Sequence, residues 1–233
     1  MLEWIRGSST DRTASLSRVR AWWLRLLGPA TFLLCCLPLA KLGIDALTGG
    51  LSADPIATGL NRLGFWALTF LALSLTPTPM KDFLGISWPI RLRRMLGLFA
   101  FAYAVLHFAW YLGIDQFFAF GEIWNDVVKR KFITFGFIAL LLLVPLAATS
   151  TRQAVSRLGY RRWKRLHRLV YLAAILGVFH FVWRVKADQR RPEIFAVVIG
   201  LLLLLRAANR LRQYLVSCIT SAKTARSGPS GPS

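Results

Sequence analysis

The chain has 233 residues, 55% of them hydrophobic, and carries 30 Lys and Arg against 10 Asp and Glu, a formal net charge of +20. A mean hydropathy of +0.50 is too apolar for a water-soluble protein. Nucleic-acid binding would explain the charge, but not apolar runs such as 137–146 (FIALLLLVPL). Both figures agree if the apolar residues lie in lipid and the basic residues at its edge. We therefore predict an integral membrane protein that contacts lipid and binds no nucleic acid.

Six segments are long and apolar enough to cross a bilayer, since a transmembrane helix needs about 20 mostly apolar residues. In chain order they are about 27–46, 63–78, 95–113, 132–149, 166–185 and 193–209. The second is short and is expected to end at Thr76-Pro77-Thr78-Pro79, because proline does not continue a helix easily. These spans predict an all-α transmembrane bundle of six helices.

Three regions follow from this pattern. Residues 1–25 are expected to form a basic cytoplasmic arm, 26–212 the transmembrane domain, and 213–233 a cytoplasmic tail that is disordered and ends in the low-complexity sequence SGPSGPS. No small-residue cleavage site follows the first apolar run, so we expect the first helix to be retained rather than removed as a signal peptide.

The orientation follows from the positions of Lys and Arg. With the N-terminus inside, twenty of these residues fall in the inner segments and eight in the outer ones. Short loops rich in Lys and Arg stay on the cytoplasmic side. Both termini are therefore expected to be cytoplasmic, and most of the basic excess has a topological role.

All three histidines of the chain, His107, His167 and His180, fall within predicted spans. An imidazole in a bilayer needs a hydrogen-bond partner or a metal, so each is a candidate functional residue. The third and fifth spans both run outward, and His107 and His180 lie at similar depths on them. Such a pair could ligate one haem iron from both faces, the arrangement of an electron-transfer cytochrome.

His167 lies near the inner surface, about 20 Å from His180 along a helix, and a straight helix would place the two rings about 140° apart. A second haem would need another ligand on the third span at this depth, where Arg94 stands. Two roles therefore stay open for His167. It could be an axial ligand at a second site, or it could line a quinol site as a proton acceptor.

Other residues are weaker candidates for a cofactor pocket. Tyr103 lies one turn before His107 and Tyr171 one turn after His167, where each could be a pocket wall or an interfacial anchor. Basic residues near the ends of the spans could pair with haem propionates, a flavin phosphate or lipid headgroups: Arg93, Arg94, Arg168 and Arg184. The three cysteines, Cys35, Cys36 and Cys218, are expected to be thiols in apolar surroundings.

Several motifs resemble those of a known family. The segment 93–98 (RRMLGL) with Tyr103 and His107 resembles the third helix of the MsrQ (YedZ) family, haem-binding membrane subunits of bacterial periplasmic methionine sulfoxide reductase systems. Segment 163–172 (WKRLHRLVYL) is similar to the start of that family's fifth helix, and segments 180–186 and 73–77 are similar to the ends of its fifth and second helices. The resemblance covers about residues 25–212.

The resemblance implies a six-helix fold of the ferric reductase and NADPH oxidase transmembrane type. Those wider relatives commonly carry four histidines for two stacked haems, whereas this chain has three, which leaves an inner haem site undefined. No cytosolic FAD/NADPH domain is expected after the last span, so electrons are expected from another source.

In function, the resemblance implies a multi-pass electron-transfer subunit of the bacterial inner membrane, containing haem b and FMN. It would take electrons from the respiratory quinone pool and pass them to MsrP, a periplasmic molybdopterin enzyme that reduces methionine sulfoxide in oxidised proteins. Catalysis would then belong to the partner in a heterodimer. The acidic 115–126 loop and the basic 184–191 loop are both candidates for docking that partner.

Two other functions compete with this one. The chain could be a free-standing ferric reductase or a cytochrome b561-like quinol oxidoreductase with no protein acceptor. It could also be a non-redox transporter or scaffold whose histidines relay protons or only form hydrogen bonds, and such a protein would be colourless.

Overall fold

A computed structural model describes residues 2–185 and 190–226, and within them every regular element is a helix. The α-helices are α1 (Leu2–Leu47), α2 (Pro55–Leu75), α3 (Pro77–Leu84), α4 (Arg93–Trp110), α5 (Phe120–Lys129), α6 (Lys131–Ala148), α7 (Arg152–Leu158), α8 (Tyr160–Leu166), α9 (Leu169–Arg184) and α10 (Arg190–Arg226). A 3-10 helix, η1 (Trp88–Arg91), precedes α4, and a π-helix, η2 (Tyr111–Asp115), extends it.

Six helical segments of the described chain are long and apolar enough to cross a membrane. They are Arg25–Leu47, Pro55–Leu84, Arg93–Asp115, Lys131–Ala148, Tyr160–Arg184 and Arg190–Ser221. Many large apolar side chains on them face outward, such as Leu33, Leu201 and Leu204. Outward apolar side chains are expected where the surrounding solvent is lipid. The prediction of an all-α, six-span membrane protein is confirmed.

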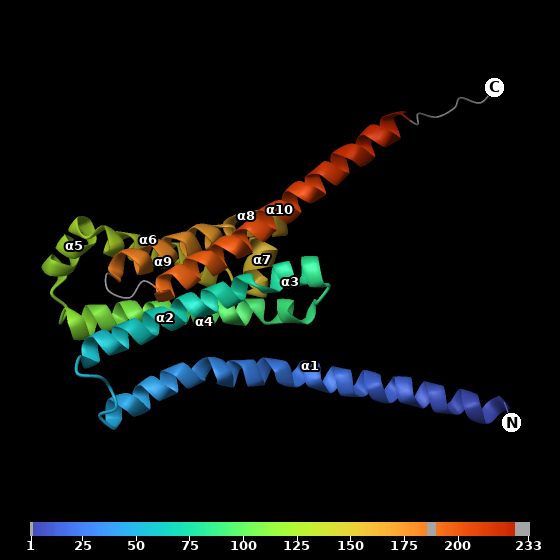
Figure 1. The fold of residues 1–233 in the computed structure, drawn as a ribbon, viewed down its shortest axis with the longest axis horizontal. Coiled ribbons are helices and arrows are strands. Elements are labelled where there is room, and N and C mark those ends of the chain that lie inside the picture. Colours follow the sequence, from blue (N-terminus) through green and yellow to red (C-terminus); the bar gives the residue numbers. More distant parts are fainter. Residues whose placement is uncertain (1, 186–189, 227–233) are drawn as a thin grey trace.

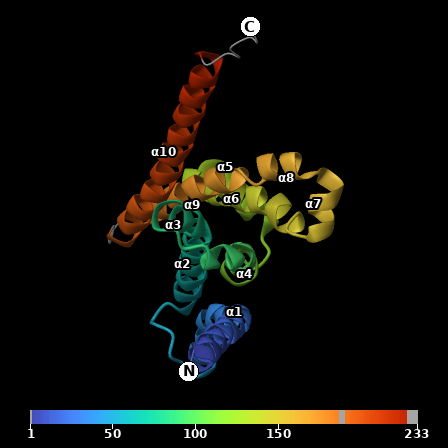
Figure 2. The same cartoon turned by 90° about the vertical axis from the view of Figure 1, so that its right-hand side faces the viewer.

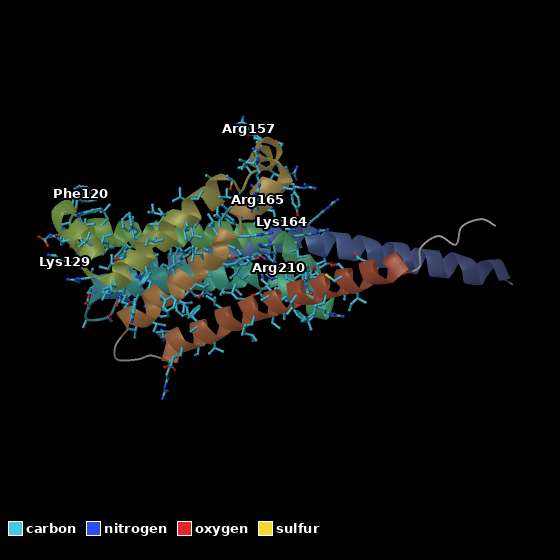
Figure 3. All side chains as sticks on the ribbon, turned by 90° about the horizontal axis from the view of Figure 1, so that it is seen from above. Phe120, Lys129, Arg157, Lys164, Arg165 and Arg210 are labelled. Carbon is cyan, nitrogen blue, oxygen red and sulfur yellow. The ribbon has the colours of Figure 1, made fainter. Side chains whose placement is uncertain are left out.

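Helices α2, α4, α6 and α9 pack side by side and form the centre of the bundle (Figure 1). α1 runs along one side of this group, next to α2 and α4, while α10 packs on α9 and projects beyond the bundle (Figures 1 and 2). α5 covers one end of the bundle, with Phe120 and Lys129 on it, and Arg157, Lys164 and Arg165 lie at the opposite end (Figure 3). We call these the α5 end and the α7 end.

The second span begins earlier than predicted, because α2 starts at Pro55 and not near residue 63. The side chain of Asp54 accepts a hydrogen bond of 2.9 Å from the Ala57 N–H, and Pro55 occupies the first helical position. Both are strong helix-start features that an apolar window does not detect. As a result Arg62 lies on α2, inside the second span.

The end of α2 at Leu75 agrees with the prediction from the proline pair. In a continuous helix the Leu75 carbonyl would accept from the N–H of residue 79, which is a proline and has none. Arg206 of α10 is 7% exposed and donates to this carbonyl through Nη2 and to the Tyr171 hydroxyl through Nη1, at 2.7 Å. A buried arginine from another span therefore satisfies the carbonyl left free by Pro79.

The fifth span is broken at its histidine. α8 ends at Leu166, His167 and Arg168 form a turn, and α9 begins at Leu169. The angle of about 140° expected between His167 and His180 assumed one straight helix, so it does not apply to this chain.

The terminal regions are more helical than expected. α1 continues the first span back to Leu2, and α10 continues the last span to Arg226. The expectation of disorder from residue 213 is therefore wrong for 213–226. A helix already formed in the membrane needs no new nucleus to extend. Residues 227–233 lie outside the described chain, as do 186–189, which form part of the proposed 184–191 docking loop.

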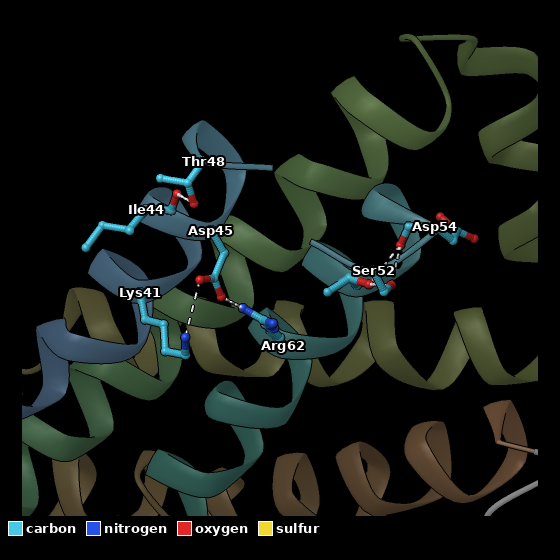
Figure 4. A network of polar contacts seen from close by, with 8 residues as sticks. Lys41, Ile44, Asp45, Thr48, Ser52, Asp54 and Arg62 are labelled. Atoms are coloured by element: carbon cyan, nitrogen blue, oxygen red, sulfur yellow. Dashed lines mark hydrogen bonds and ion pairs between the residues drawn. The ribbon is translucent and has the colours of Figure 1, made fainter. Parts of the chain in front are cut away.

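α1 is attached to the bundle by polar contacts as well as apolar packing. At its C-terminal end Asp45 pairs with Lys41 and with Arg62 of α2 (Figure 4). Near the middle of the first span the Tyr103 hydroxyl donates to the Cys35 carbonyl at 2.8 Å and accepts from the Leu39 N–H at 3.1 Å. In a regular α-helix the Cys35 carbonyl would accept from the Leu39 N–H, because the two residues are four positions apart. Pro38 precedes Leu39 in α1. Tyr103 is thus inserted into the hydrogen-bond ladder of α1.

We expect Tyr103→Phe to weaken the attachment of α1 without affecting a cofactor. The substitution removes two hydrogen bonds to α1, and we expect it to lower the free energy of unfolding by about 1–2 kcal/mol. Thermal and denaturant unfolding in detergent measure the loss, and the optical spectrum of the same sample measures the cofactor. A spectrum altered by Tyr103→Phe would instead support the predicted role of Tyr103 in the pocket.

Candidate functional site

A cavity of about 490 Å³ lies between α2, α4, α6 and α9. Sites for small molecules and cofactors typically have volumes of about 300–1,000 Å³ and lie between the helices of a bundle. His107 of α4 and His180 of α9 both line the cavity. The two histidines that the sequence placed at similar depths therefore face one space.

The two imidazole rings stand opposite each other across the cavity. Their centroids are 6.0 Å apart and the ring planes are inclined at 81°. A metal–imidazole nitrogen bond is about 2.0 Å and the ring centre lies roughly 1 Å further back, so two rings on opposite sides of one metal ion are separated by about 6 Å. The separation of this pair is compatible with a shared metal ion.

The hydrogen bonds of the rings leave the other nitrogen of each histidine available. Nδ1 of His107 lies 2.9 Å from the Leu60 carbonyl, and Nδ1 of His180 lies 2.7 Å from the Phe132 carbonyl. A carbonyl oxygen only accepts, so Nδ1 must carry the proton in both rings. Nε2 of each ring then keeps its lone pair, as a metal ligand must, and the carbonyl fixes the orientation of the ring.

Two glycines make room for these rings. A Cβ atom on Gly64 of α2 would lie 3.0 Å from Cε1 of His107, and one on Gly136 of α6 would lie 2.6 Å from Nδ1 of His180. Each glycine comes four residues after the carbonyl that accepts from the same ring, Leu60 or Phe132. The α2–α4 and α6–α9 pairs thus hold a histidine by the same arrangement.

The cavity has two chemically different halves. Beyond the histidines toward the α7 end it is lined by small and apolar side chains, including Ala67, Leu71, Ala100, Ala104, Ala139, Leu143 and Ala173. Toward the α5 end it is lined by polar side chains, including Asp54, Asn61, Tyr111, Asp115, Asp126, Arg130 and Arg184. The residues therefore fit a flat, largely apolar group with a polar edge, held by two imidazoles, as a haem would be.

His167 lies in different surroundings, at the turn between α8 and α9. Its Nε2 is 3.1 Å from Oγ1 of Thr149, and its ring packs on Trp163 with a centroid distance of 4.1 Å. The Thr149 hydroxyl donates its single proton to the Pro145 carbonyl at 2.6 Å, so Nε2 of His167 must be the donor to Thr149. Its lone pair is then on Nδ1, and ligation through Nε2 would require loss of the bond to Thr149.

The remaining predicted site residues do not line the cavity. Tyr103 is bound to α1, and Tyr171 accepts from Arg206 at the α7 end. Arg94 is exposed on the first turn of α4. Its neighbour Arg93 is half-buried at the start of α4. The structure therefore brings together His107 and His180, while His167, Tyr171 and Arg93 lie toward the opposite end.

Similarity to known proteins agrees with this geometry. Residues 58–178 match the family described as ferric reductase like transmembrane component. This segment contains most of α2, all of α4 and α6, and the part of α9 that ends two residues before His180. A relative from Rhodospirillum rubrum, "Protein-methionine-sulfoxide reductase heme-binding subunit MsrQ", is 53% identical over 79% of this chain and 88% of its own length. This chain belongs to the MsrQ family.

Other MsrQ proteins show the same extent of similarity. The MsrQ of Deinococcus radiodurans is 50% identical over 80% of this chain and 92% of its own length, and that of Herminiimonas arsenicoxydans is 48% identical over 78% and 85%. The family resemblance inferred from the motifs is confirmed, as is the ferric reductase-like transmembrane fold. The chain is a multi-pass membrane protein.

Proposed function

We propose that this chain is the haem-binding membrane subunit of a protein-methionine-sulfoxide reductase, and that His107 and His180 hold a haem b as its axial pair. The observation that carries the proposal is the opposed pair of rings, 6.0 Å apart, with both Nδ1 atoms bonded to carbonyls. The curated relatives are named as heme-binding subunits of this system. A haem held by two imidazoles supplies one-electron transfer with no open coordination position.

Electrons enter at the α7 end and leave at the α5 end in this proposal. The α7 end carries the excess of Lys and Arg expected on the cytoplasmic side, including Arg157, Lys164 and Arg165 (Figure 3). The α5 end then faces the periplasm of a bacterial inner membrane. The acidic 115–126 segment includes Asp115 and Asp126, which line the polar half of the cavity, so we favour it as the place where MsrP docks.

The overall reaction balances over two one-electron transfers. Oxidation of a quinol to a quinone releases two electrons and two protons. Reduction of a methionine sulfoxide by the molybdopterin enzyme MsrP consumes two electrons and two protons and gives methionine and water. This chain's residues hold and orient the carrier between the two reactions, and they exclude water from it. FMN is proposed from the family resemblance alone.

The optical spectrum of the purified, detergent-solubilised protein tests this function. Oxidised and dithionite-reduced spectra should show the sharp bands of a low-spin b-type haem, and a pyridine haemochrome should give a fixed ratio of haem to protein. Addition of MsrP and methionine sulfoxide should then reoxidise the reduced sample. A colourless protein that takes up no haem would overturn the proposal. Haem that MsrP cannot reoxidise would favour a free-standing quinol oxidoreductase or ferric reductase.

His167 is expected to serve quinol oxidation as a proton acceptor rather than as a haem ligand. Its Nε2 is occupied by Thr149, while Nδ1 keeps a lone pair. A positioned base typically contributes a rate factor of about 10²–10⁴, so His167→Ala should slow reduction by a soluble quinol at least about 100-fold. Reduction by dithionite and the haem content should stay unchanged. Loss of part of the haem in His167→Ala would instead assign it to a second haem.

A further inference from the structure

We infer that Arg184 is the counter-ion of the haem carboxylates, and that the carboxylate edge of the haem faces the α5 end of the cavity. This inference rests on the proposed function and adds the orientation of the cofactor to it. It follows from the two unlike halves of the cavity and from the position of Arg184 on α9.

The apolar half of the cavity cannot accept the carboxylate edge. A haem b carries two propionates on one side of the macrocycle, and these are anionic at neutral pH. The side chains toward the α7 end, such as Ala100, Leu143 and Ala173, offer no donor. Burial of an unpaired carboxylate among such groups is strongly unfavourable. The propionates must therefore point toward the polar half.

The polar half contains only two basic side chains among the described residues that line it, Arg130 and Arg184. Arg130 already pairs with Asp126 at 2.9 Å, and Asp126 also accepts from the Tyr111 hydroxyl at 3.0 Å. Arg184 makes no ion pair within the described chain, and donates through Nη1 to the neutral side-chain oxygen of Asn61. Its charge is the one left to balance an anionic ligand.

The position of Arg184 also suits this role. It comes four residues after His180, one turn nearer the α5 end and on the same face of α9. Three carboxylates also line this half: Asp54, Asp115 and Asp126. Asp54 caps α2 and Asp126 is paired, and Asp115 accepts a hydrogen bond of 2.9 Å from the Gln116 side chain. An anionic edge is acceptable beside these acids only if Arg184 is present.

The midpoint potential of the haem tests the inference. A positive charge near the propionates favours the ferrous state, which carries one more electron, so Arg184→Gln should lower the potential. We expect an approximately tenfold smaller equilibrium constant for reduction, which is about 59 mV for a one-electron couple. Arg184→Lys keeps the charge and should stay close to the wild type. Arg184→Met replaces the glutamine variant if that variant does not accumulate.

Arg191→Gln is the matched control. Arg191 is an exposed arginine that faces the Phe65 ring at 6.0 Å and does not line the cavity, so its removal should leave the potential unchanged. Spectroelectrochemical titration of the four proteins at one pH measures all of these values. Equal potentials in the wild type and Arg184→Gln, with a normal low-spin spectrum, would overturn the inference. Absence of low-spin haem in the wild type would instead overturn the proposed function.

Discussion

Removal of either histidine of the opposed pair should abolish the low-spin haem spectrum. In His107→Ala or His180→Ala, one side of the iron loses its ligand and the facing ring is left with no partner across the cavity. Loss of an outer-shell group typically costs 10–100-fold in metal affinity, so loss of a ligand itself should lower the low-spin haem content by more than about tenfold. Absorption spectra and haemochrome assays of the purified variants measure the loss, and delivery of electrons to MsrP should fall with it.

His167→Ala is the matched control, because it removes the third intramembrane histidine from a site with a different hydrogen-bond arrangement. The His107 and His180 rings donate from Nδ1 to carbonyls, whereas His167 donates from Nε2 to Thr149. The control should therefore keep the low-spin bands that the other two variants lose. Full low-spin haem in the double variant of His107 and His180 would refute the assignment of the axial pair.

The sequence was sufficient to predict that His107 and His180 lie at similar depths, where the structure places their rings 6.0 Å apart. Both lie in spans that run in the same direction, so counting residues from the same membrane surface gives their relative depth. The six apolar segments were also readable, because a bilayer requires long apolar helices whatever their neighbours are. These features depend on local composition and on a repeat distance, and both are visible in a single sequence.

The contacts that orient the rings could not be predicted in this way. Gly64 and Gly136 matter because each faces a histidine on another helix, and spacing along one helix does not tell which face meets which neighbour. The same holds for Arg206, whose partner Leu75 lies 131 positions away. The free carbonyl could still have been anticipated, because Pro79 removes the N–H that Leu75 would bind.

The turn at His167 could not be predicted for a more local reason. The apolar stretch continues through Leu166 and Leu169, so the sequence suggested one straight helix. In the structure the chain turns at His167 and Arg168, where the Thr149 hydroxyl and the Trp163 ring hold the imidazole. Hydropathy reports that a segment is apolar, but it does not detect a break made by side-chain hydrogen bonds from another helix.

Gly136→Ala should damage the haem site although it adds only one methyl group. Its Cβ atom would lie 2.6 Å from Nδ1 and 2.9 Å from Cε1 of His180, closer than real Cβ contacts allow. The imidazole must move, which breaks its 2.7 Å bond to the Phe132 carbonyl and changes the orientation of the ring. We expect loss of most low-spin haem, as for His180→Ala, although the ligand itself is still present.

Two other glycines provide a graded comparison for the same added methyl group. At Gly64 the new Cβ would lie 3.0 Å from Cε1 of His107, so a shift of a few tenths of an ångström is enough and a partial loss is expected. At Gly97, also on a span, no atom lies within 4 Å. There alanine should leave the spectrum intact and stabilise α4 by about 0.5–1 kcal/mol.

We expect the largest haem loss in Gly136→Ala, a smaller loss in Gly64→Ala and none in Gly97→Ala. This order distinguishes an effect on the position of the imidazole rings from a general effect on helix packing. A packing effect would follow the unfolding free energies of the three variants, which the same denaturant titrations measure. Ring positioning predicts instead that Gly136→Ala loses its spectrum while it remains folded. If Gly136→Ala kept full low-spin haem, the His180 ring would have to be held by something other than the close approach of α6.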